Sequence, residues 1–310
     1  MIIVMGVFAV DFVFQTPEIP IWTKTQIGSG FSIGPGGKGS NQAIAVARLG
    51  AEVEFIAKIG ADYYGSMARG IYQTEGVGTR FLQESAELPT GSAAIIVHAV
   101  EKENAIIIVP GAAATLTTAE IDTAAAEIGQ AAAFVTQLET PLPLVRHALS
   151  LAKAAGVRTI LNPAPVPEGP VSDALWEIIR LADILTPNEK EASELTGLPV
   201  TTPEEAEAAA DALIAQGAGA VIITLGEKGA LLRQNGETVM VPAVRAGAVV
   251  DTTGAGDSFN AGVAVALSEG RSMVEALRFA CAVAGLKVTR AGAGAGMPRR
   301  HEVDALLASG

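Results

Sequence analysis

One glycine-bracketed segment near the carboxyl end of the chain could bind an anion and accept a proton. Residues 251–257 read DTTGAGD and run directly into an apolar helical stretch, Ser258 to Leu267. At the start of a helix, consecutive backbone N–H groups converge on an anion, and the helix dipole adds its positive end. Asp257 could then accept the proton of a hydroxyl that attacks a phosphorus atom. The alternative is a glycine-rich turn in which Asp257 only caps the helix.

A second glycine-rich loop lies near the amino end, at residues 34–41, with the sequence GPGGKGSN. Its formal G-x-G-x-x-G pattern does not indicate a dinucleotide site, because such a site follows the first core strand, where Val4–Phe8 lacks the pattern. A Walker A motif is excluded because Gly39, and not Ser or Thr, follows Lys38. What remains is a loop of close backbone approach that carries Lys38 and Asn41, and this suits a polyhydroxylated ligand.

Short β-branched runs alternate with helical stretches along most of the chain. We expect strands at residues 2–7, 54–59, 132–137, 158–161, 183–186 and 220–225. We expect helices at residues 41–49, 67–74, 119–128, 142–155, 189–196 and 203–216. This alternation predicts a mostly parallel sheet that is covered by helices on both faces. Ligands in such sheets gather at the carboxyl ends of strands, and segment 251–257 would follow a strand at Ala248–Val250 in this way.

Two stretches contain strands with no helix between them. The first pairs residues 11–14 with 26–33, and the second pairs 92–99 with 105–109 across the polar turn 101–104. These strands predict a small separate sheet over the main one, which could act as a lid. The alternative is an ordinary β-extension of the core. We therefore expect one α/β domain over residues 1–310, with lid strands drawn from about 10–33 and 91–109.

Composition excludes several classes of protein. The formal net charge of −12 argues against nucleic acid or an anionic membrane as a partner and favours a small ligand. Cys281 is the only cysteine, so no intramolecular disulfide can form, and the three histidines lack metal-ligand spacing. The apolar start of the chain reads as a first strand and not as a secretion signal. A cytoplasmic location is the resulting expectation.

The two glycine motifs together resemble those of the ribokinase-like carbohydrate kinases, also called the phosphofructokinase-B family. Residues 36–41 and 251–257 look like the two signature motifs of this family. Further segments fall in the family's order and spacing at 137–141, 162–165, 186–191 and 224–229. The resemblance covers essentially the whole chain. It implies a three-layer α/β/α fold with a mostly parallel central sheet and a small β-sheet lid.

The resemblance also implies an ATP-dependent kinase in which Asp257 deprotonates the attacking hydroxyl. The anion hole would consist of Gly254, Ala255 and Gly256. Together with Mg²⁺, held mostly through water by Glu191, these N–H groups would stabilise the charge-spread transition state. The nucleotide would meet Asn188, Thr224, Gly226, Gly229 and Cys281. Without the resemblance, Asn188 could simply cap a helix and the residues at 224–229 could form a plain turn.

For the sugar, the resemblance points to Asp11, Gly37, Lys38, Asn41 and Glu139. The implied reaction phosphorylates the primary hydroxyl of a pentose, with ribose giving ribose 5-phosphate. Ala9 departs from the family, which usually has an Asn there that contacts the sugar, and a missing amide forfeits about 1 kcal/mol for a hydroxyl that it would have bonded. The alternatives therefore include 2-deoxyribose, another sugar, a sugar acid or a nucleoside, and a non-catalytic sensor of sugar or nucleotide.

Two further expectations concern a cation and an assembly. The family binds a monovalent cation, usually K⁺, mainly through carbonyl oxygens, at positions that match Asp251, Thr253, Lys287, Arg290, Gly292 and Gly296. Gly296 stands where a Ser hydroxyl is common. We expect K⁺ activation on this basis. The apolar lid strands also predict a homodimer through the lid, because a small sheet would otherwise expose its edges and one apolar face.

Overall fold

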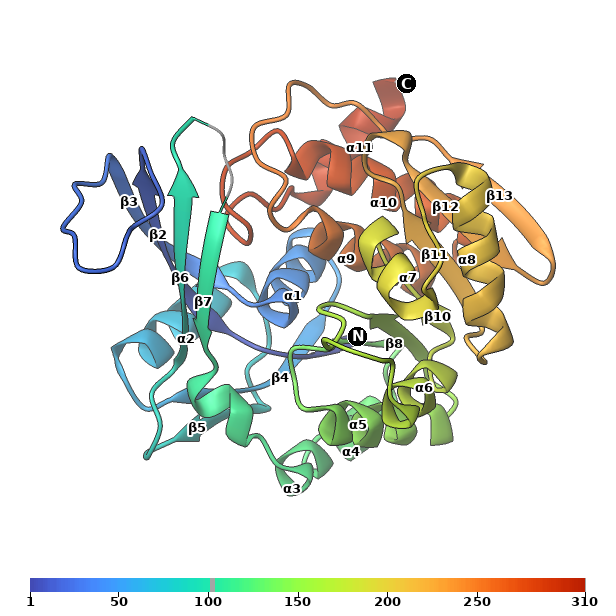
Figure 1. The fold of residues 1–310 in the computed structure, drawn as a ribbon. Coiled ribbons are helices and arrows are strands. Elements are labelled where there is room, and N and C mark those ends of the chain that lie inside the picture. The colour runs from blue at the N-terminus through green and yellow to red at the C-terminus, as the bar shows by residue number, and fades with distance from the viewer. Residues whose placement is uncertain (101–103, 310) are drawn as a thin grey trace.

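The computed structural model describes residues 1–100 and 104–309. Within this part of the chain, nine strands form the main sheet in the order β13-β12-β11-β10-β9-β8-β1-β4-β5 (Figure 1). Their bounds are β1 Ile2–Met5, β4 Val53–Gly60, β5 Leu82–Ser85, β8 Ala133–Gln137, β9 Arg158–Asn162, β10 Ile184–Leu185, β11 Ala220–Thr224, β12 Ala230–Gln234 and β13 Glu237–Val241. The run from β11 to β5 is parallel, whereas β12 and β13 form an antiparallel edge.

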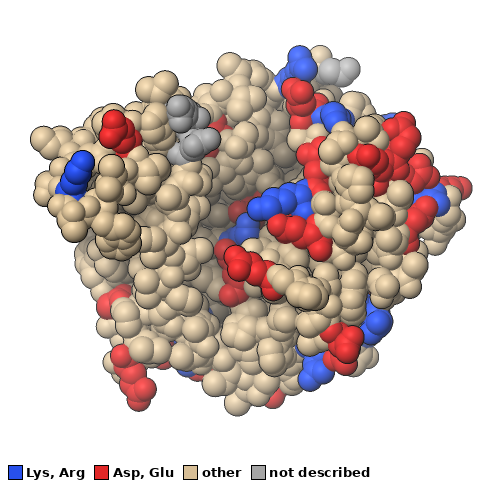
Figure 2. Space-filling view, viewed as in Figure 1, with Lys and Arg blue, Asp and Glu red and all other residues tan. Residues whose placement is uncertain are grey.

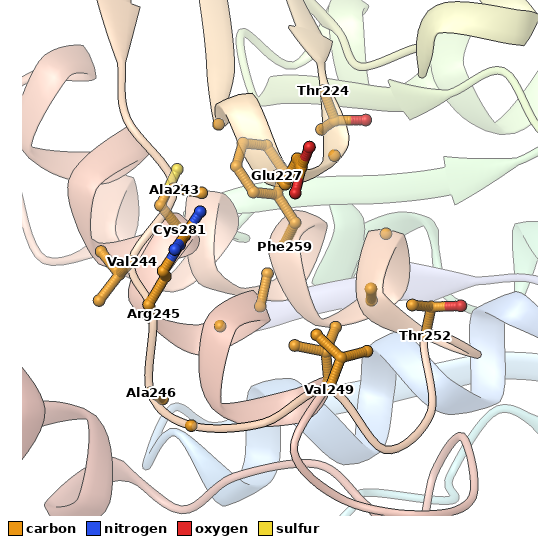
Figure 3. Close-up of a pocket in the computed structure, with 18 residues that line it drawn as sticks. Thr224, Glu227, Ala243, Val244, Arg245, Ala246, Val249, Thr252, Phe259 and Cys281 are labelled. Atoms are coloured by element: carbon orange, nitrogen blue, oxygen red, sulfur yellow. The ribbon is translucent and has the colours of Figure 1, made fainter.

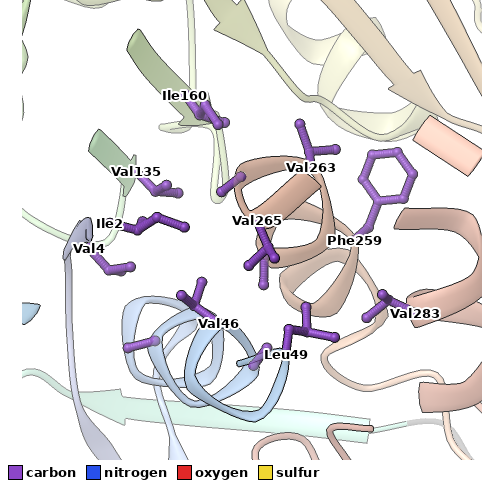
Figure 4. Packing of buried hydrophobic residues seen from close by; sticks show 14 of the residues in the cluster. Ile2, Val4, Val46, Leu49, Val135, Ile160, Phe259, Val263, Val265 and Val283 are labelled. Carbon is purple, nitrogen blue, oxygen red and sulfur yellow. The ribbon is translucent and has the colours of Figure 1, made fainter. Parts of the chain in front are cut away.

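Helices cover both faces of this sheet. One face carries α1 Lys38–Arg48, α2 Tyr63–Glu75, α9 Ala255–Ser268, α10 Met273–Lys287 and α11 Arg300–Ser309. The other face carries α3 Thr118–Asp122, α4 Ala125–Ile128, α5 Leu142–Ala154, α6 Asp173–Arg180, α7 Glu189–Thr196 and α8 Pro203–Ala215. Because successive strand side chains point to opposite faces, Ile2 and Val4 of β1 enter the first core and Ile3 and Met5 the second. Figure 4 shows the first core, where Val46 of α1 and Val265 of α9 lie over β1.

A second, smaller sheet lies beside the main one, at the left of Figure 1. In the described residues it has the order β3-β2-β6-β7. Its strands are β2 Ala9–Thr16, β3 Gly30–Gly36, β6 Gly91–His98 and β7 Asn104–Val109. Strands β2 and β6 pair in parallel, and the outer pairs are antiparallel. The chain enters β2 almost directly from β1 and enters α1 directly from β3, so this sheet is tied to the carboxyl edge of β1.

The predicted fold class is confirmed, since a large, mostly parallel sheet lies between two helical layers and a small separate sheet stands apart. The predicted turn at 101–104 falls largely on Glu101, Lys102 and Glu103, which lie outside the described residues. Among the described helices, none has the length and apolar character needed to cross a membrane.

Several predicted elements were wrong in detail. Residues 248–250 form no strand, because Val249 is 67% exposed and the N–H of Val250 donates to the carbonyl of Val288 at the end of α10. The predicted helix at 119–128 is broken into α3 and α4, where the N–H of Ala124 turns back to Ile121. The strand predicted at 26–33 begins at Gly30 instead, because pairing with β2 starts at Gln15 opposite Gly30. Strands β5, β12 and β13 were not predicted; β5 and β13 are the two edges of the main sheet.

Candidate active site

Asp257 lies in the first turn of α9 and is held by two side-chain amides. Its Oδ2 accepts a hydrogen bond from Nδ2 of Asn41 at 2.9 Å, and its Oδ1 accepts one from Nε2 of Gln42 at 3.1 Å. The side chain is only 6% exposed. Burial raises its pKa above the ordinary aspartate value, while the charge of Lys38 and the two amide hydrogen bonds oppose that rise. The result is a carboxylate with a fixed orientation and a proton affinity above that of an exposed Asp.

Gln42 was missed by the sequence analysis. It is 0% exposed, and its Oε1 accepts a hydrogen bond at 2.6 Å from Nε2 of Gln137, the last residue of β8. A chain of amides therefore runs from the centre of the sheet to Asp257. The available signal was a Gln directly after Asn41 in the predicted helix. If such a side chain is buried, its amide needs a hydrogen-bond partner.

The glycine-bracketed turn stands at the start of α9. Gly254 precedes the helix with a φ of 78°, and a Cβ on it would lie 3.2 Å from Cα of Ala293. The N–H of Ala255 donates to the carbonyl of Thr252 at 3.1 Å. The first N–H groups of a helix have no acceptor within the helix, so this turn presents donors and the positive end of the dipole. Gly254, Ala255 and Gly256 all line a polar cavity of about 140 Å³ together with Lys38 and Asp257.

The glycine loop before α1 brings the expected sugar-binding residues together. Gly37 has a φ of 88°, and a Cβ on it would lie 2.2 Å from the carbonyl oxygen of Val7. This close approach allows the N–H of Lys38 to donate to Oε2 of Glu139 at 2.8 Å. A Cβ on Gly36 would fall 2.1 Å from Oδ1 of Asp11, so that carboxylate packs directly on the loop. This face of the molecule is hollowed beside the small sheet, and charged side chains gather in the hollow (Figure 2).

Burial dominates the electrostatics of this group. It raises the pKa of Glu139 to about 7, although the charge of Lys38 acts in the opposite direction. It also raises the pKa of Asp11 to about 6. Burial would by itself lower the pKa of Lys38, but the carboxylates of Asp257, Glu139 and Glu191 hold it above the usual lysine value. Lys38 is therefore a cation near three carboxylates, and its ammonium can donate hydrogen bonds to a phosphate and to a hydroxyl.

A larger cavity of about 570 Å³ adjoins the polar one. Thr224, Gly226, Gly229 and Cys281 all line it, as the sequence analysis expected of a nucleotide site (Figure 3). Val244, Phe259 and Val288 add apolar walls. The two cavities share Thr224, Thr252, Ala255 and Gly256, so the start of α9 stands where they meet.

Two glycines and one uncharged thiol shape the wall of this large cavity. Gly226 and Gly229 have φ values of 54° and 105° around the short turn Gly226–Lys228. A Cβ on Gly229 would lie 2.0 Å from the carbonyl oxygen of Val241, which only glycine avoids. Burial raises the pKa of the Cys281 thiol to about 11, so this residue is a small uncharged wall and not a nucleophile.

Asn188 and Glu191 form a capping box at the start of α7. The Asn188 side chain accepts from the N–H of Glu191 at 2.8 Å, and Oε2 of Glu191 accepts from the N–H of Asn188 at 2.9 Å. Both residues line the polar cavity, so Asn188 caps the helix and faces the site at once. Among the described residues, no group of three or more His, Cys, Asp or Glu side chains could hold a metal ion. Both oxygens of Glu191 accept hydrogen bonds from Asn188, so Glu191 fits Mg²⁺ through water, an ion that usually binds through one or two carboxylates, water and substrate phosphates.

The six residues expected at a K⁺ site do lie in one loop region, but their geometry differs from the expectation. Oδ1 and Oδ2 of Asp251 accept from the N–H groups of Thr253 and Gly292, at 2.9 and 2.8 Å. The ammonium of Lys287 donates to the carbonyl oxygens of Asp251 and Arg290, at 3.0 and 3.2 Å. Two of the carbonyls expected to bind K⁺ thus already bind a cationic side chain. The residues present do not fit a K⁺ ion at these carbonyls.

Comparison with known proteins gives matches over most of the chain. Residues 1–300 match the pfkB family carbohydrate kinase. The chain is 40% identical over 299 residues to a ribokinase of Haemophilus influenzae, covering 96% of this chain and 95% of that protein. It is 37% identical to a deoxyribokinase of Salmonella typhi, covering 83% of this chain and 82% of that protein. Arabidopsis thaliana ribokinase, solved with ribose and ATP, superposes with a TM-score of 0.90 at 32% identity, covering 99% of this chain and 98% of that one.

Proposed function

Because the chain belongs to the pfkB family of carbohydrate kinases, we propose that it transfers the terminal phosphoryl group of ATP to the primary hydroxyl of ribose. The product is ribose 5-phosphate. The observation that carries this proposal is the position of Asp257, beneath the junction of two cavities and oriented by Asn41 and Gln42. A sensor that only binds its ligands would need no such oriented base.

In this proposal Asp257 accepts the proton as the sugar oxygen attacks the phosphorus atom. A base acts best when its pKa is near the working pH, and burial moves the pKa of Asp257 in that direction. The N–H groups of Gly254 and Gly256, joined by that of Ala255 once it leaves the carbonyl oxygen of Thr252, face the charge that spreads over the transferring phosphoryl group. Mg²⁺, when bound, neutralises charge on the phosphates, and Glu191 would hold it through water.

The sugar lies, in our proposal, between the small sheet and α1. Asp11 and Glu139 accept hydrogen bonds from its hydroxyls, and Lys38, Asn41 and the backbone at Gly37 complete the site. ATP lies along the larger cavity, with its phosphates near Asn188 and Thr224 and its base near Gly226, Gly229 and Cys281. We treat residues 1–310 as one α/β domain whose small sheet acts as a lid that excludes water during transfer.

Ala9 bears on which sugar is the substrate. It stands at the start of β2, two residues before Asp11, and it offers no amide to a sugar hydroxyl. Since a deoxyribokinase is among the similar proteins, 2-deoxyribose is the second candidate. Release of ADP with a panel of acceptors, at fixed ATP, Mg²⁺ and K⁺, tests this. Turnover of a nucleoside or ketose without turnover of ribose or 2-deoxyribose would reject the pentose assignment.

A homodimer through the small sheet is part of this proposal. Strand β7 is an edge strand with exposed apolar side chains, and Ile107 is 64% exposed. Exposed edges and apolar patches of this kind favour pairing with a second copy. A monomeric mass by light scattering at micromolar concentration would contradict the dimer.

We also propose a cytoplasmic location, which suits an ATP-dependent enzyme whose single cysteine forms no intramolecular disulfide.

A further inference from the structure

Lys287, the last residue of α10, is the feature that the proposed reaction does not explain. Its side chain is 0% exposed, which is rare for a lysine unless the ammonium is paired. Among the described residues its hydrogen bonds go to the carbonyl oxygens of Asp251 and Arg290 and to no carboxylate. Burying an ammonium costs several kcal/mol unless other groups compensate. The surroundings of Lys287 must therefore provide a site for a positive charge.

The groups that accept hydrogen bonds from the Lys287 ammonium are of the kind that coordinate a small monovalent cation. Backbone carbonyl oxygens coordinate such ions by replacing their hydration shell. Burial lowers the pKa of Lys287 below the usual lysine value, and the carboxylates of Asp251 and Asp257 oppose that fall through their charge, without a direct hydrogen bond. One of the two carbonyls belongs to Asp251, which opens the segment that ends at Asp257. The ammonium is thus hydrogen-bonded to the same segment, 251–257, that would present N–H groups to the phosphate.

Gly296 makes room for this lysine. A Cβ at position 296 would lie 3.2 Å from Cε of Lys287, and 2.5 Å from the carbonyl oxygen of Gly292. The second distance is a backbone clash that by itself requires glycine at 296, and the first shows that the lysine side chain passes through the space beside it. The absence of a side chain at 296 and the presence of a long one at 287 therefore fit each other in space.

We propose that the ammonium of Lys287 is a built-in replacement for the monovalent cation, so that this kinase needs no K⁺. A tethered charge holds the segment 251–257 at all salt compositions, whereas a free ion does so only when it is bound. This inference rests on the proposed function for its activity test. It also makes a claim about stability that does not depend on any substrate.

The first test uses the unmodified protein. Its kinase activity with ATP and Mg²⁺ is measured in KCl and in tetramethylammonium chloride at equal ionic strength. We expect the two rates to agree within about twofold, because the site already carries its charge. Its thermal unfolding midpoint, measured without ATP or sugar, should likewise be the same in both salts. A rate more than about twofold higher in KCl, or a higher unfolding midpoint in KCl than in tetramethylammonium chloride, would overturn the proposal.

The second test removes the charge. Lys287→Ala empties the space around both carbonyls, and we expect its rate to fall roughly tenfold or more without K⁺ and to recover when K⁺ is added. Lys287→Met is the matched control, because it keeps most of the side-chain volume and lacks the charge. It should lose activity and not recover with K⁺. Full activity of Lys287→Ala in the absence of K⁺ would contradict a role for the ammonium.

A third variant keeps the test decisive if Lys287→Ala folds poorly. Lys287→Ser supplies a hydroxyl in the space that the lysine leaves and keeps Gly296, where a Cβ would meet the carbonyl oxygen of Gly292 at 2.5 Å. Its unfolding midpoint should rise with KCl concentration, as expected for an ion that binds only the folded state, and should not rise with tetramethylammonium chloride. Because unfolding needs no substrate, this result stands apart from the proposed kinase activity. An unfolding midpoint that responds to K⁺ in neither Lys287→Ala nor Lys287→Ser would overturn the proposal.

Discussion

Nε2 of Gln42 lies 3.1 Å from Oδ1 of Asp257, and both side chains are buried between α1 and α9. The two residues are 215 positions apart in the chain. Since Asn41 holds the other oxygen of the carboxylate, the two amides together fix its orientation. We regard Gln42 as a positioning residue for the base.

Gln42→Leu should therefore weaken catalysis while leaving ATP in place. A hydrogen bond to a charged group contributes about 1.5–3 kcal/mol, so kcat/KM should fall by at least about tenfold. Loss of the donor raises the pKa of Asp257, so the acidic limb of the pH–rate profile should move to higher pH. The ATP dissociation constant, measured by calorimetry, should stay unchanged. An acidic limb at its original pH would show that Gln42 only fills space.

Asp257→Asn removes the proton acceptor and keeps the shape of the side chain. We expect turnover to fall roughly a hundredfold or more, because general base catalysis typically contributes this much. ATP binding should be nearly intact, since the N–H groups and the larger cavity are unaltered. Steady-state rates and an ATP titration on the same preparation measure both. Turnover equal to that of the unmodified protein would remove Asp257 from the mechanism.

Gly36→Ala tests the placement of Asp11 without touching its charge. The new Cβ would lie 2.1 Å from Oδ1 of Asp11, so the carboxylate must move. We expect the KM for the sugar to rise about tenfold while the KM for ATP changes little, because Asp11 binds the sugar and not the nucleotide in the proposed complex. Gly70→Ala in α2 is the control, since a Cβ there meets nothing within 4 Å. Equal sugar KM values in the two variants would place the sugar away from Asp11.

Glu139→Gln tests the raised pKa of Glu139 through stability. The folded-state pKa of about 7 lies above the ordinary value of 4.5, so the folded protein binds the proton more tightly than the unfolded chain does. Stability from this group is fully present below about pH 4.5 and is lost as the pH rises through about 7, by up to roughly 3 kcal/mol. The variant should gain stability relative to the unmodified protein between pH 5 and pH 8. Urea unfolding at several pH values measures this difference. A difference that shrinks as the pH rises would mean that Lys38 outweighs burial.

The sequence was informative where short motifs carry the chemistry. Lys38, Asn41 and Asp257 stand in glycine-rich loops whose local geometry is largely set by their own residues, and the structure brings these side chains into one cavity or its wall. Alternating strands and helices likewise predicted the layers, because burial on both faces of a parallel sheet leaves a strong pattern of apolar residues.

The sequence did not predict the contacts between segments that are distant in the chain. The amide chain through Gln42 and Gln137 joins α1 to β8, and no local pattern predicts such a pairing. The residues Ala248–Val250 have the composition of a strand, yet among the described residues no strand pairs with them. Lys287 was assigned to the cation loop by position alone. That its side chain turns back onto the carbonyls of Asp251 and Arg290 depends on the space at Gly296.

We propose that this chain moves a phosphoryl group from ATP to the primary hydroxyl of a pentose with Asp257 as base. Phosphorus NMR of a reaction containing the purified protein, ATP, Mg²⁺, K⁺ and ribose follows both products at once. We predict equal amounts of ADP and of a phosphate monoester on the 5-oxygen of ribose, and almost none of either with Asp257→Asn. ATP that stays intact, or is hydrolysed to free phosphate, in the presence of ribose and of 2-deoxyribose would contradict the account.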